Sequence, residues 1–496
     1  MTPGHAKLPP VTDPGRSPAP GPALTADDLL AATGGVLVHR SGRPIRGGAV
    51  DSRLVTPGCL FVALAGDRTD GHRYLRAAVD AGAAAILVSR DPDPATGEPA
   101  LEALGDVTVV RVPDTLRALH AVAAAWRVRF SPLVVGITGS IAKTSTKEAV
   151  AGVLAGRFPT LRTEGNQNNE VGLPLTVLRL GPEHGAAVLE MGMYVGGEIH
   201  DLAAICRPSI GIVTAVQPVH LSRIGTIEAI EDAKAELVEA LPAAADGGVA
   251  ILNRDDARVA RMASRTRARV VTYGFDDAAD VTAADIISAG FRGMQFRLRT
   301  PAGEVDAAIP SLGKLAVHNA LAATAVGLAA GMTLEEILPG LAVTVTAPHR
   351  SAITRVRGMT IVDDAYNASP GSMRAALDLL DGLPGRHVAV LGEMKELGDA
   401  HEAGHREVGA AAAGLDLLVV VDGAPGGAAE GIARGAREAG IPEDRIVVTA
   451  DTASTVDTLR LATAPGDVVL VKASRGVELE RVVDGLVAAL RAEDEA

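Results

Sequence analysis

Short apolar runs alternate with helix-forming segments along almost the whole chain, from about residue 24 to residue 490. Continuous apolar runs bounded by turn residues are typical of buried strands in parallel sheets, and the segments between them favour crossover helices. The pattern therefore predicts an α/β fold. In the first part, the predicted strands are Cys59–Ala63, Ala85–Val88 and Val107–Arg111, and the predicted helices are Asp27–Ala32 (capped by Thr25), Tyr74–Ala81 and Thr115–Val128.

The same alternation continues after Pro132 and starts again near Pro348, which indicates two further domains. The last part alternates five apolar runs with helical stretches, which is typical of a doubly wound parallel sheet. We expect a disordered, Pro- and Gly-rich tail over 1–22 and domains over 23–130, 131–346 and 347–496. The predicted strands are Leu133–Ile137, Val188–Met191, Ile210–Thr214, Thr360–Val362, Val388–Leu391, Leu417–Val421, Arg445–Val448 and Val468–Val471, and the predicted helices include Ile227–Leu241, Ala316–Leu328 and Leu334–Leu341.

Composition narrows the class of protein. The formal net charge of −13 argues against nucleic acid as a partner, because a phosphate backbone requires a basic surface. The two cysteines, Cys59 and Cys206, are too far apart for a metal motif, and we expect two reduced thiols. No apolar run reaches the roughly 18 residues of a membrane span, and the N-terminus lacks a signal-peptide pattern. A cytoplasmic location is the expectation.

The run Leu133–Ile137 leads into a glycine turn, a Lys-Thr pair and a helix-forming segment. This order predicts a phosphate cradle, in which backbone N–H groups face an anion, Lys143 reaches the terminal phosphates and Thr144 binds Mg²⁺. The loop is shorter than the general phosphate-loop pattern, and Ala142 occupies the place of a glycine. If that position requires a positive φ, alanine costs roughly 1–2 kcal/mol there. An ordinary strand-to-helix turn is the alternative.

Further polar residues follow predicted strands, where ligands bind in open α/β sheets. Glu190 ends an apolar run and is a candidate Mg²⁺ ligand, although an exposed strand end is the alternative. His220 follows a strand and is either a ligand or structural. The loop 163–174 is rich in amides that suit a sugar or a peptide, or that form a simple turn. The pair Asp363-Asp364 suits a metal, a ribose or an amine, or caps a helix.

Taken together, these segments resemble the Mur ligases, ATP-dependent amide-forming enzymes of peptidoglycan synthesis, and within that family the D-alanyl-D-alanine-adding MurF type. The resemblance covers about residues 24–490. The matching motifs, in family order, are Asp51-Ser52-Arg53, Asp70-Gly71-His72, Thr138 to Thr144, Glu164 to Pro174, Glu190-Met191-Gly192, His220-Leu221, Ala233-Lys234, Leu391 to Met394 with Glu396-Leu397-Gly398, and Lys472 to Gly476.

The resemblance implies a three-domain architecture: a small α/β UDP-binding domain, a central ATPase domain with a mostly parallel sheet, and a C-terminal Rossmann-like domain. It implies a monomer that uses ATP and Mg²⁺ to join D-alanyl-D-alanine to UDP-N-acetylmuramoyl-tripeptide through an acyl phosphate, with the site completed by domain closure. The implied catalytic residues are Lys143, Glu190, His220 and Lys234, and the implied metal ligands are Thr144, Glu190, His220 and a carbamylated Lys234. The implied nucleotide contacts are Gly139, Ser140, Ala142, Lys143, Thr144, Ser145, Asn253, Asn319, Arg350 and Asp364. The implied substrate contacts are Ser52, Arg53, Asp70, His72, Asn166, Asn168, Asn169, Tyr366, Asn367, Ser474 and Arg475.

The chain departs from the family pattern on the nucleotide side. Ile141 and Ala142 replace the usual Asn-Gly of the phosphate loop, and of a later Gly-x-His-Asn-x-x-Asn motif only Asn319 matches. These departures affect ATP affinity and rate but leave the fold in place. Two alternatives stay open: a ligase of the same fold with another amine or acid substrate, and a non-catalytic paralogue that binds substrate without turnover.

Overall fold

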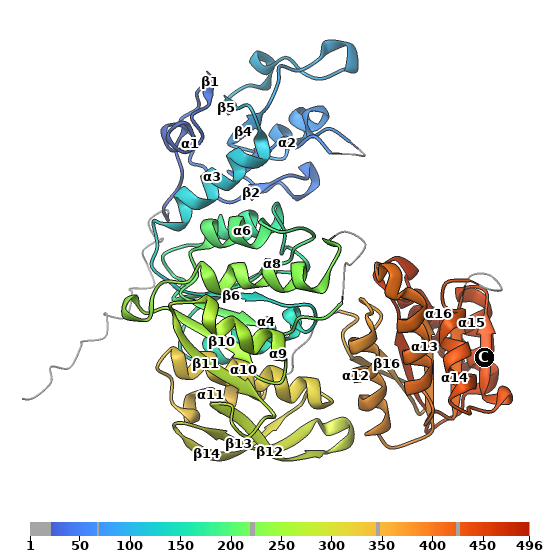
Figure 1. Ribbon diagram of the computed structural model, residues 1–496. Helices are drawn as coiled ribbons and strands as arrows, with labels where there is room; N and C mark the ends of the chain where they lie inside the picture. Colours follow the sequence, from blue (N-terminus) through green and yellow to red (C-terminus); the bar gives the residue numbers. More distant parts are fainter. Residues whose placement is uncertain (1–20, 67–68, 219–223, 344–347, 423–426, 496) are drawn as a thin grey trace, which may run out of the picture. The chain divides into compact units, whose positions relative to one another are not determined.

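The computed structural model describes residues 21–66, 69–218, 224–343, 348–422 and 427–495 (Figure 1). The chain divides into two compact units: residues up to Ala118 with Arg179–Glu183, and Leu119–Leu178 with the residues from His184 onward. The expected tail over 1–22 lies almost wholly outside the described residues. In the described part of the chain, no helix has both the length and the apolar character needed to cross a membrane.

The first unit contains a five-stranded sheet in the order β1-β5-β4-β3-β2. The four strands from β5 to β2 are parallel, and β1 joins β5 in antiparallel fashion. Thr25 caps the first helix through a capping box with Asp28, as its position in the sequence predicts. The strands are β1 (Val36–His39), β2 (Gly48–Ala49), β3 (Leu60–Val62), β4 (Ala85–Val88) and β5 (Thr108–Arg111), and the helices are α1 (Ala26–Thr33) and α2 (Leu75–Asp80). Helix α3 (Thr115–Arg127) begins in this unit and continues into the second from Leu119.

The second unit begins with a nine-stranded sheet in the order β14-β13-β12-β11-β10-β9-β6-β8-β7. It is parallel from β7 to β12, and β13 and β14 extend it as an antiparallel hairpin. The strands are β6 (Leu133–Thr138), β7 (Thr160–Arg162), β8 (Ala186–Glu190), β9 (Ile210–Val213), β10 (Val249–Asn253), β11 (Arg269–Gly274), β12 (Val281–Ser288), β13 (Met294–Thr300) and β14 (Gly303–Ile309). The helices are α4 (Lys143–Ala155), α5 (Gly172–Val177), α6 (Glu198–Cys206), α8 (Ile227–Glu239), α9 (Ala257–Arg261), α10 (Lys314–Ala329) and α11 (Leu334–Leu341).

Strand β6 shows why both faces of this sheet are covered. Val135 and Ile137 belong to the core cluster that includes Val150 of α4 and Leu321 of α10. The residue between them, Gly136, faces the other side, where an added Cβ would lie 2.9 Å from a methyl group of Leu237 on α8. Since successive side chains of a strand point to opposite faces, a continuous apolar run requires helices on both sides.

The C-terminal part contains a six-stranded sheet in the order β15-β16-β20-β17-β18-β19, parallel except for the pair β15–β16. Its faces also alternate: Ala389 and Leu391 of β17 belong to one core cluster, and Val388 and Val390 to another. The strands are β15 (Ala352–Val356), β16 (Met359–Asp363), β17 (His387–Gly392), β18 (Leu417–Val421), β19 (Ile446–Thr449) and β20 (Val468–Lys472). The helices are α12 (Pro370–Asp381), α13 (His401–Ala411), α14 (Glu430–Glu438), α15 (Thr452–Ala462) and α16 (Glu480–Glu495).

The α/β class and the doubly wound C-terminal sheet are confirmed, and the predicted strands are present with ends shifted by one or two residues. The sequence prediction gives no bounds for the strands β1, β2, β7, β10, β11, β12 and β15 or for the antiparallel hairpin β13–β14. The strands of this hairpin alternate buried and exposed residues, a pattern that differs from the continuous apolar runs by which the predicted strands were identified. The domain boundaries near residues 130 and 346 stay predictions.

Candidate active site

The turn after β6 is built around Gly139, whose φ is 149°. A Cβ added at Gly139 would lie 1.8 Å from the hydroxyl of Thr214, so no side chain fits there. Ser140 fastens the turn to the segment after β9: its N–H donates to Ala215 O at 2.8 Å, and its hydroxyl donates to Gln217 O at 3.1 Å. The turn is therefore held against the end of the neighbouring strand.

Ala142 precedes α4 in the left-handed region, with a φ of 65° and a ψ of −2°. The position therefore has the positive φ that a glycine adopts without strain, and alanine occupies it at a cost of roughly 1–2 kcal/mol. No side chain caps α4, and Lys143 folds back so that its Nζ donates to Gly139 O at 2.8 Å. The unsatisfied N–H groups of the first turn of α4 make this end of the helix suitable for an anion.

Glu190, at the end of β8, joins the phosphate-loop helix to the amide-rich loop. Its Oε2 accepts from the hydroxyl of Thr144 at 2.8 Å, and its Oε1 accepts from the amide nitrogen of Asn168 at 2.7 Å. The residue is 2% exposed. A buried carboxylate beside a threonine hydroxyl offers the hard oxygen ligands that Mg²⁺ prefers.

Two further residues of α4 hold this arrangement in place. Lys147 is fully buried, and its Nζ donates to the carbonyl of Thr163, where the amide-rich loop begins. The hydroxyl of Thr163 in turn accepts from the N–H of Glu190. On the other side of α4, Thr146 donates to Oδ1 of Asn319 on α10 at 2.9 Å. Asn319 therefore positions the phosphate-loop helix, and Lys147 is a structural residue of the site that sequence reasoning missed.

Lys234 on α8 is 3% exposed, and its side chain makes no hydrogen bond or ion pair with any described residue. Burial lowers the pKa of its ammonium well below the ordinary value, and the charge of Lys143 adds to this effect. Burial also lowers the pKa of Lys143, while the carboxylate of Glu190 opposes that shift. A buried amine with a depressed pKa is neutral and nucleophilic at lower pH than an exposed lysine.

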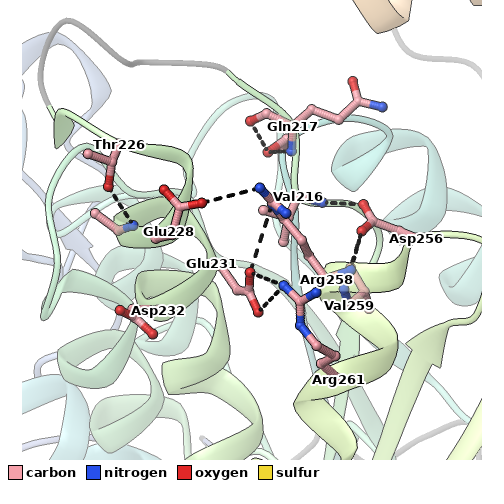
Figure 2. Close-up of polar contacts among 12 residues, drawn as sticks. Val216, Gln217, Thr226, Glu228, Glu231, Asp232, Asp256, Arg258, Val259 and Arg261 are labelled. Carbon is pink, nitrogen blue, oxygen red and sulfur yellow. Dashed lines mark hydrogen bonds and ion pairs between the residues drawn. The ribbon is translucent and has the colours of Figure 1, made fainter.

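Polar contacts join α8 to α9, and α9 to the segment after β9 (Figure 2). Asp256 accepts from Val216 N at 2.7 Å and caps α9 through Arg258 N at 2.9 Å. From α9, Arg261 pairs with Glu231 of α8 at 2.9 Å, and Arg258 reaches the same carboxylate at 3.9 Å. The segment after β9, α9 and α8 therefore form one connected support.

In the C-terminal domain, Asp364 ties three segments together. Its Oδ1 accepts from Ser351 N at 3.0 Å, and its Oδ2 accepts from Lys472 Nζ at 2.6 Å. Lys472 is 3% exposed and also donates to Asn367 O at 2.8 Å. Both carboxylate oxygens of Asp364 are engaged, so the residue positions its neighbours. Next to it, Asp363 binds Nδ1 of His349 at 2.7 Å.

The strand pairing explains why these segments meet. Asp363 at the end of β16 pairs with Ala352 at the start of β15 and with Val471 near the end of β20. The residues before β15, after β16 and after β20 are therefore brought to one edge of the sheet. There the guanidinium of Arg350 lies over the ring of Tyr366, 4.0 Å from its centroid, and that of Arg475 lies 5.0 Å from the same centroid.

The segment after β17 is fastened to this edge. The hydroxyl of Ser474 accepts from Lys395 N at 2.8 Å, and Ser474 N donates to Glu393 O at 3.0 Å. The buried imidazole of His405 accepts from Met394 N at 2.9 Å. Ser474 is 4% exposed, so its contribution is to hold this segment.

A cavity of about 1130 Å³ in the second unit brings most of the predicted residues together. Asn253 is not among its lining residues. Its Nδ2 donates to Thr214 O and its Oδ1 accepts from Asp255 N, so both polar atoms of the side chain are engaged within the protein. His220 lies outside the described residues. Predicted residues that line the cavity are Gly139, Ser140, Ala142, Lys143, Thr144, Ser145, Asn166, Asn168, Asn169, Glu190, Lys234, Asn319, Arg350, Asp364, Tyr366, Asn367, Ser474 and Arg475; Lys395, Glu396 and Lys472 also line it.

The predicted substrate residues of the first unit form two local structures. Asp51 accepts from Arg53, whose side chain is mostly exposed. His72 is 1% exposed, and both ring nitrogens are engaged, Nδ1 with Asp70 at 2.6 Å and Nε2 with Ser89 N at 3.1 Å. His72 therefore has no free polar atom for a substrate, and it shapes the loop that follows Asp70. Ser52 begins the short 3₁₀ turn that Asp51 caps, and its contact with substrate stays a prediction.

The residues present fit both the phosphates of ATP and Mg²⁺. The turn at Gly139 leaves a backbone cradle that a single Cβ would fill, which suits a phosphate. Thr144 and Glu190 supply neighbouring oxygen atoms that suit Mg²⁺. No cluster of three or more His, Cys, Asp or Glu side chains able to hold a metal occurs among the described residues, so a metal here would require other ligands as well.

Comparison with known proteins agrees with this geometry. Three Mur ligase family models match: the family's catalytic domain at residues 44–127, the middle domain at 137–327, and the glutamate ligase domain at 349–475. The UDP-N-acetylmuramoyl-tripeptide–D-alanyl-D-alanine ligase of Escherichia coli is 38% identical, covering 88% of this chain and 92% of the relative. The ligase of the same name from Mycobacterium tuberculosis is 39% identical over 88% of this chain and 91% of its own.

Solved structures agree as well. A MurF crystal structure from Acinetobacter baumannii has a TM-score of 0.83 and 29% identity, and the match covers 95% of this chain and 100% of that one. MurF ligase from Thermotoga maritima in complex with ADP has a TM-score of 0.78 and 28% identity, covering 90% and 98%. With the phosphate-loop turn, the Thr144–Glu190 pair and the doubly wound C-terminal sheet in place, the chain belongs to the Mur ligase family and, within it, to the MurF type.

Proposed function

We propose that this protein forms an amide bond between UDP-N-acetylmuramoyl-tripeptide and D-alanyl-D-alanine, with conversion of ATP to ADP and phosphate, in peptidoglycan precursor synthesis. Family membership supports the reaction class, since relatives at 35–39% identity bear the name of this ligase. The structural observation that carries the proposal is the network in which Glu190 accepts from both Thr144 and Asn168. It joins a phosphate cradle to a loop suited to a peptide or sugar.

A carboxylate is a poor acyl donor, and the terminal phosphoryl group of ATP converts it into an acyl phosphate. The phosphates would lie on the turn at Gly139 and the first N–H groups of α4, with Lys143 released from Gly139 O to meet their charge. Mg²⁺, when bound, would neutralise charge on the transferring phosphoryl group, and Thr144 and Glu190 would hold it.

Lys234 has the properties needed for carbamylation. Its amine is buried, without a polar partner among the described residues, and has a depressed pKa. Addition of the neutral amine to CO₂ forms an N–C bond and releases one proton, which turns the side chain into a carboxylate-like anion. That anion would lie near the charge of Lys143, whose pKa it would raise again.

The remaining side chains bind and orient the substrates. The amide loop with Asn166, Asn168 and Asn169 would contact the nucleotide-linked peptide, and Arg350 would bind the nucleotide from the C-terminal domain. Asp364 and Ser474 would act by holding their segments, since their polar atoms are already engaged. The amine of D-alanyl-D-alanine then attacks the acyl phosphate, and phosphate leaves.

The test is phosphate release by the purified full-length chain with Mg-ATP, UDP-N-acetylmuramoyl-tripeptide and D-alanyl-D-alanine, omitting each in turn. Release that requires all three, together with a product of the expected mass, supports the proposal. Release with a different amine or acid would assign another substrate on the same fold. Binding without release under any combination would make the chain a non-catalytic relative.

A further inference from the structure

Tyr366 lies in the loop that follows β16 and lines the cavity. Its N–H donates to His349 O at 3.0 Å, next to Arg350 in sequence. On the other side, Lys472, which begins the run that contains Arg475, donates to Asn367 O at 2.8 Å. The loop carrying Tyr366 is therefore hydrogen-bonded to both arginine-bearing segments, and its ring lies under both guanidinium groups.

Two guanidinium groups that share one ring repel each other unless an anion or a carboxylate compensates them. Neither guanidinium, of Arg350 or of Arg475, forms an ion pair or a hydrogen bond within the described parts of the chain, and both residues line the cavity. Asp364, the carboxylate in the same loop as Tyr366, is already bound to Ser351 and Lys472. Within the described residues, both guanidinium groups therefore contact the ring of Tyr366, and their N–H donors are available to ligands.

We infer that Tyr366 is a positioning residue that holds Arg350 and Arg475 as a pair, each for a different anion bound during the same turnover. This rests on the proposed function, which supplies two anions: the phosphates of the nucleotide and the free carboxylate of the incoming dipeptide. Arg350 binds the first and Arg475 binds the second. Binding of either anion lowers the repulsion between the two guanidiniums, so each substrate favours binding of the other.

The contribution of Tyr366 comes from the face of its ring, because a cation is attracted by the ring quadrupole and the phenolic hydroxyl makes no hydrogen bond among the described residues. This separates the inference from an ordinary substrate contact through the hydroxyl. It also predicts that a ring without a hydroxyl replaces tyrosine, whereas an aliphatic side chain of similar size does not.

The experiment compares Tyr366→Phe and Tyr366→Leu in the full chain, with steady-state kinetics for each substrate. For Tyr366→Leu we expect KM to rise about three- to tenfold for both ATP and D-alanyl-D-alanine, the size of a cation–π contact for each guanidinium, while KM for the UDP-linked substrate stays unchanged. Tyr366→Phe should keep all three KM values within about twofold of wild type, because its ring attracts cations as well. Arg475→Gln should raise KM for the dipeptide far more than for ATP.

The matched control is Phe158→Leu, which removes a ring from beneath Arg157, 5.6 Å from that ring's centroid and outside the cavity lining. It should leave every KM unchanged. If Tyr366→Leu does not fold, as judged by circular dichroism, Tyr366→Met replaces it, because methionine adapts to irregular gaps. Unchanged KM values in a folded aliphatic variant, or equal losses in the Phe and Leu variants, overturn the inference. A wild-type chain without turnover instead overturns the proposed function.

Discussion

Thr144 and Glu190 are 46 positions apart in sequence, yet the threonine hydroxyl donates to the glutamate Oε2 at 2.8 Å. The pair forms because β8 lies beside β6 in parallel register, with Ile137 opposite Glu190, so that both strands end at the same place. The second carboxylate oxygen is held by Asn168. Glu190 is thus presented to the cavity in one fixed orientation by one donor from α4 and one from the loop 163–174.

Glu190→Gln is expected to abolish most turnover while the chain stays folded. The amide removes the negative charge that suits Mg²⁺. Its NH₂ group would also face one of the two present donors, the Thr144 hydroxyl or the Asn168 amide, and could not accept a hydrogen bond from it. We expect kcat to fall by about a hundredfold or more, the scale of losing one electrostatic contact at a reacting phosphate. Phosphate-release kinetics measure this. Glu148→Gln, on the helix α4 that carries Thr144 but outside the cavity lining, is the control; comparable losses in both variants would contradict the assignment.

Ala142→Gly is expected to stabilise the chain. The left-handed φ of 65° costs alanine roughly 1–2 kcal/mol, and glycine's greater freedom in the unfolded chain returns about 0.5–1 of this. A net gain of about 0.5–1 kcal/mol should appear as a higher urea midpoint with an unchanged m-value. KM for ATP should stay the same or fall, since the backbone path is already that of a glycine.

The control for this substitution is Ala155→Gly at the exposed last residue of the same helix. There glycine should cost up to about 1 kcal/mol, because the backbone is helical and glycine only adds unfolded-state entropy. Equal effects of the two substitutions would show that strain at Ala142 is not stored in the folded protein.

Lys234→Met is expected to raise stability in CO₂-free buffer at pH 7 and to remove turnover. Burial depresses the pKa of Lys234 in the folded state, so between that pKa and about 10.4 the unfolded chain binds more protons. Stability therefore rises with pH across this window and falls as pH decreases. Methionine has no ammonium to desolvate, and its variant should show a shallower rise in urea midpoint from pH 7 to 10.

Carbon dioxide provides the second measurement on Lys234. Added bicarbonate should raise wild-type turnover and give a protein mass larger by one CO₂, and it should change neither property in Lys234→Met. Lys147→Met is the control, because Lys147 is also buried but its Nζ donates to Thr163 O. This variant should still gain the mass of one CO₂. A mass increase that persists in Lys234→Met would place the modification elsewhere.

The sequence predicted strands that are continuous apolar runs, and it missed strands such as β13 and β14, in which buried and exposed residues alternate. It predicted the cavity residues because their motifs follow the predicted strands. It also anticipated the strain at Ala142, since a glycine-type position was occupied by alanine. It could not predict which polar residues are already satisfied. His72, Asn253 and Ser474 have ligand-like motifs, yet their partners are backbone atoms from distant segments. The buried Lys147 was missed, and Lys472 was named only as part of a motif, because the backbone carbonyls that they contact lie in other segments of the chain.

The last prediction concerns Glu98 in the first unit, which forms a bidentate pair with Arg90 at 2.7 Å for both contacts. The hydrogen bonds from Arg90 lower the pKa of Glu98 from 4.5 to about 2, and Asp93 N adds a further bond. Because the folded pKa lies below the unfolded one, this stabilisation is complete above about pH 4.5 and is lost as pH falls toward 2.

Glu98→Gln should therefore destabilise the chain by about 1–3 kcal/mol at pH 7, because a neutral amide replaces one of the two carboxylates that pair with Arg90, Asp70 being the other. The difference from wild type should shrink as pH falls from 5 toward 2, because the wild-type carboxyl is then protonated too. Urea midpoints at several pH values measure this, and Glu102→Gln, a carboxylate with no ion pair among the described residues, should show no such convergence. A Glu98→Gln difference that stays constant with pH would mean that packing, and not the charge of Glu98, carries the stabilisation.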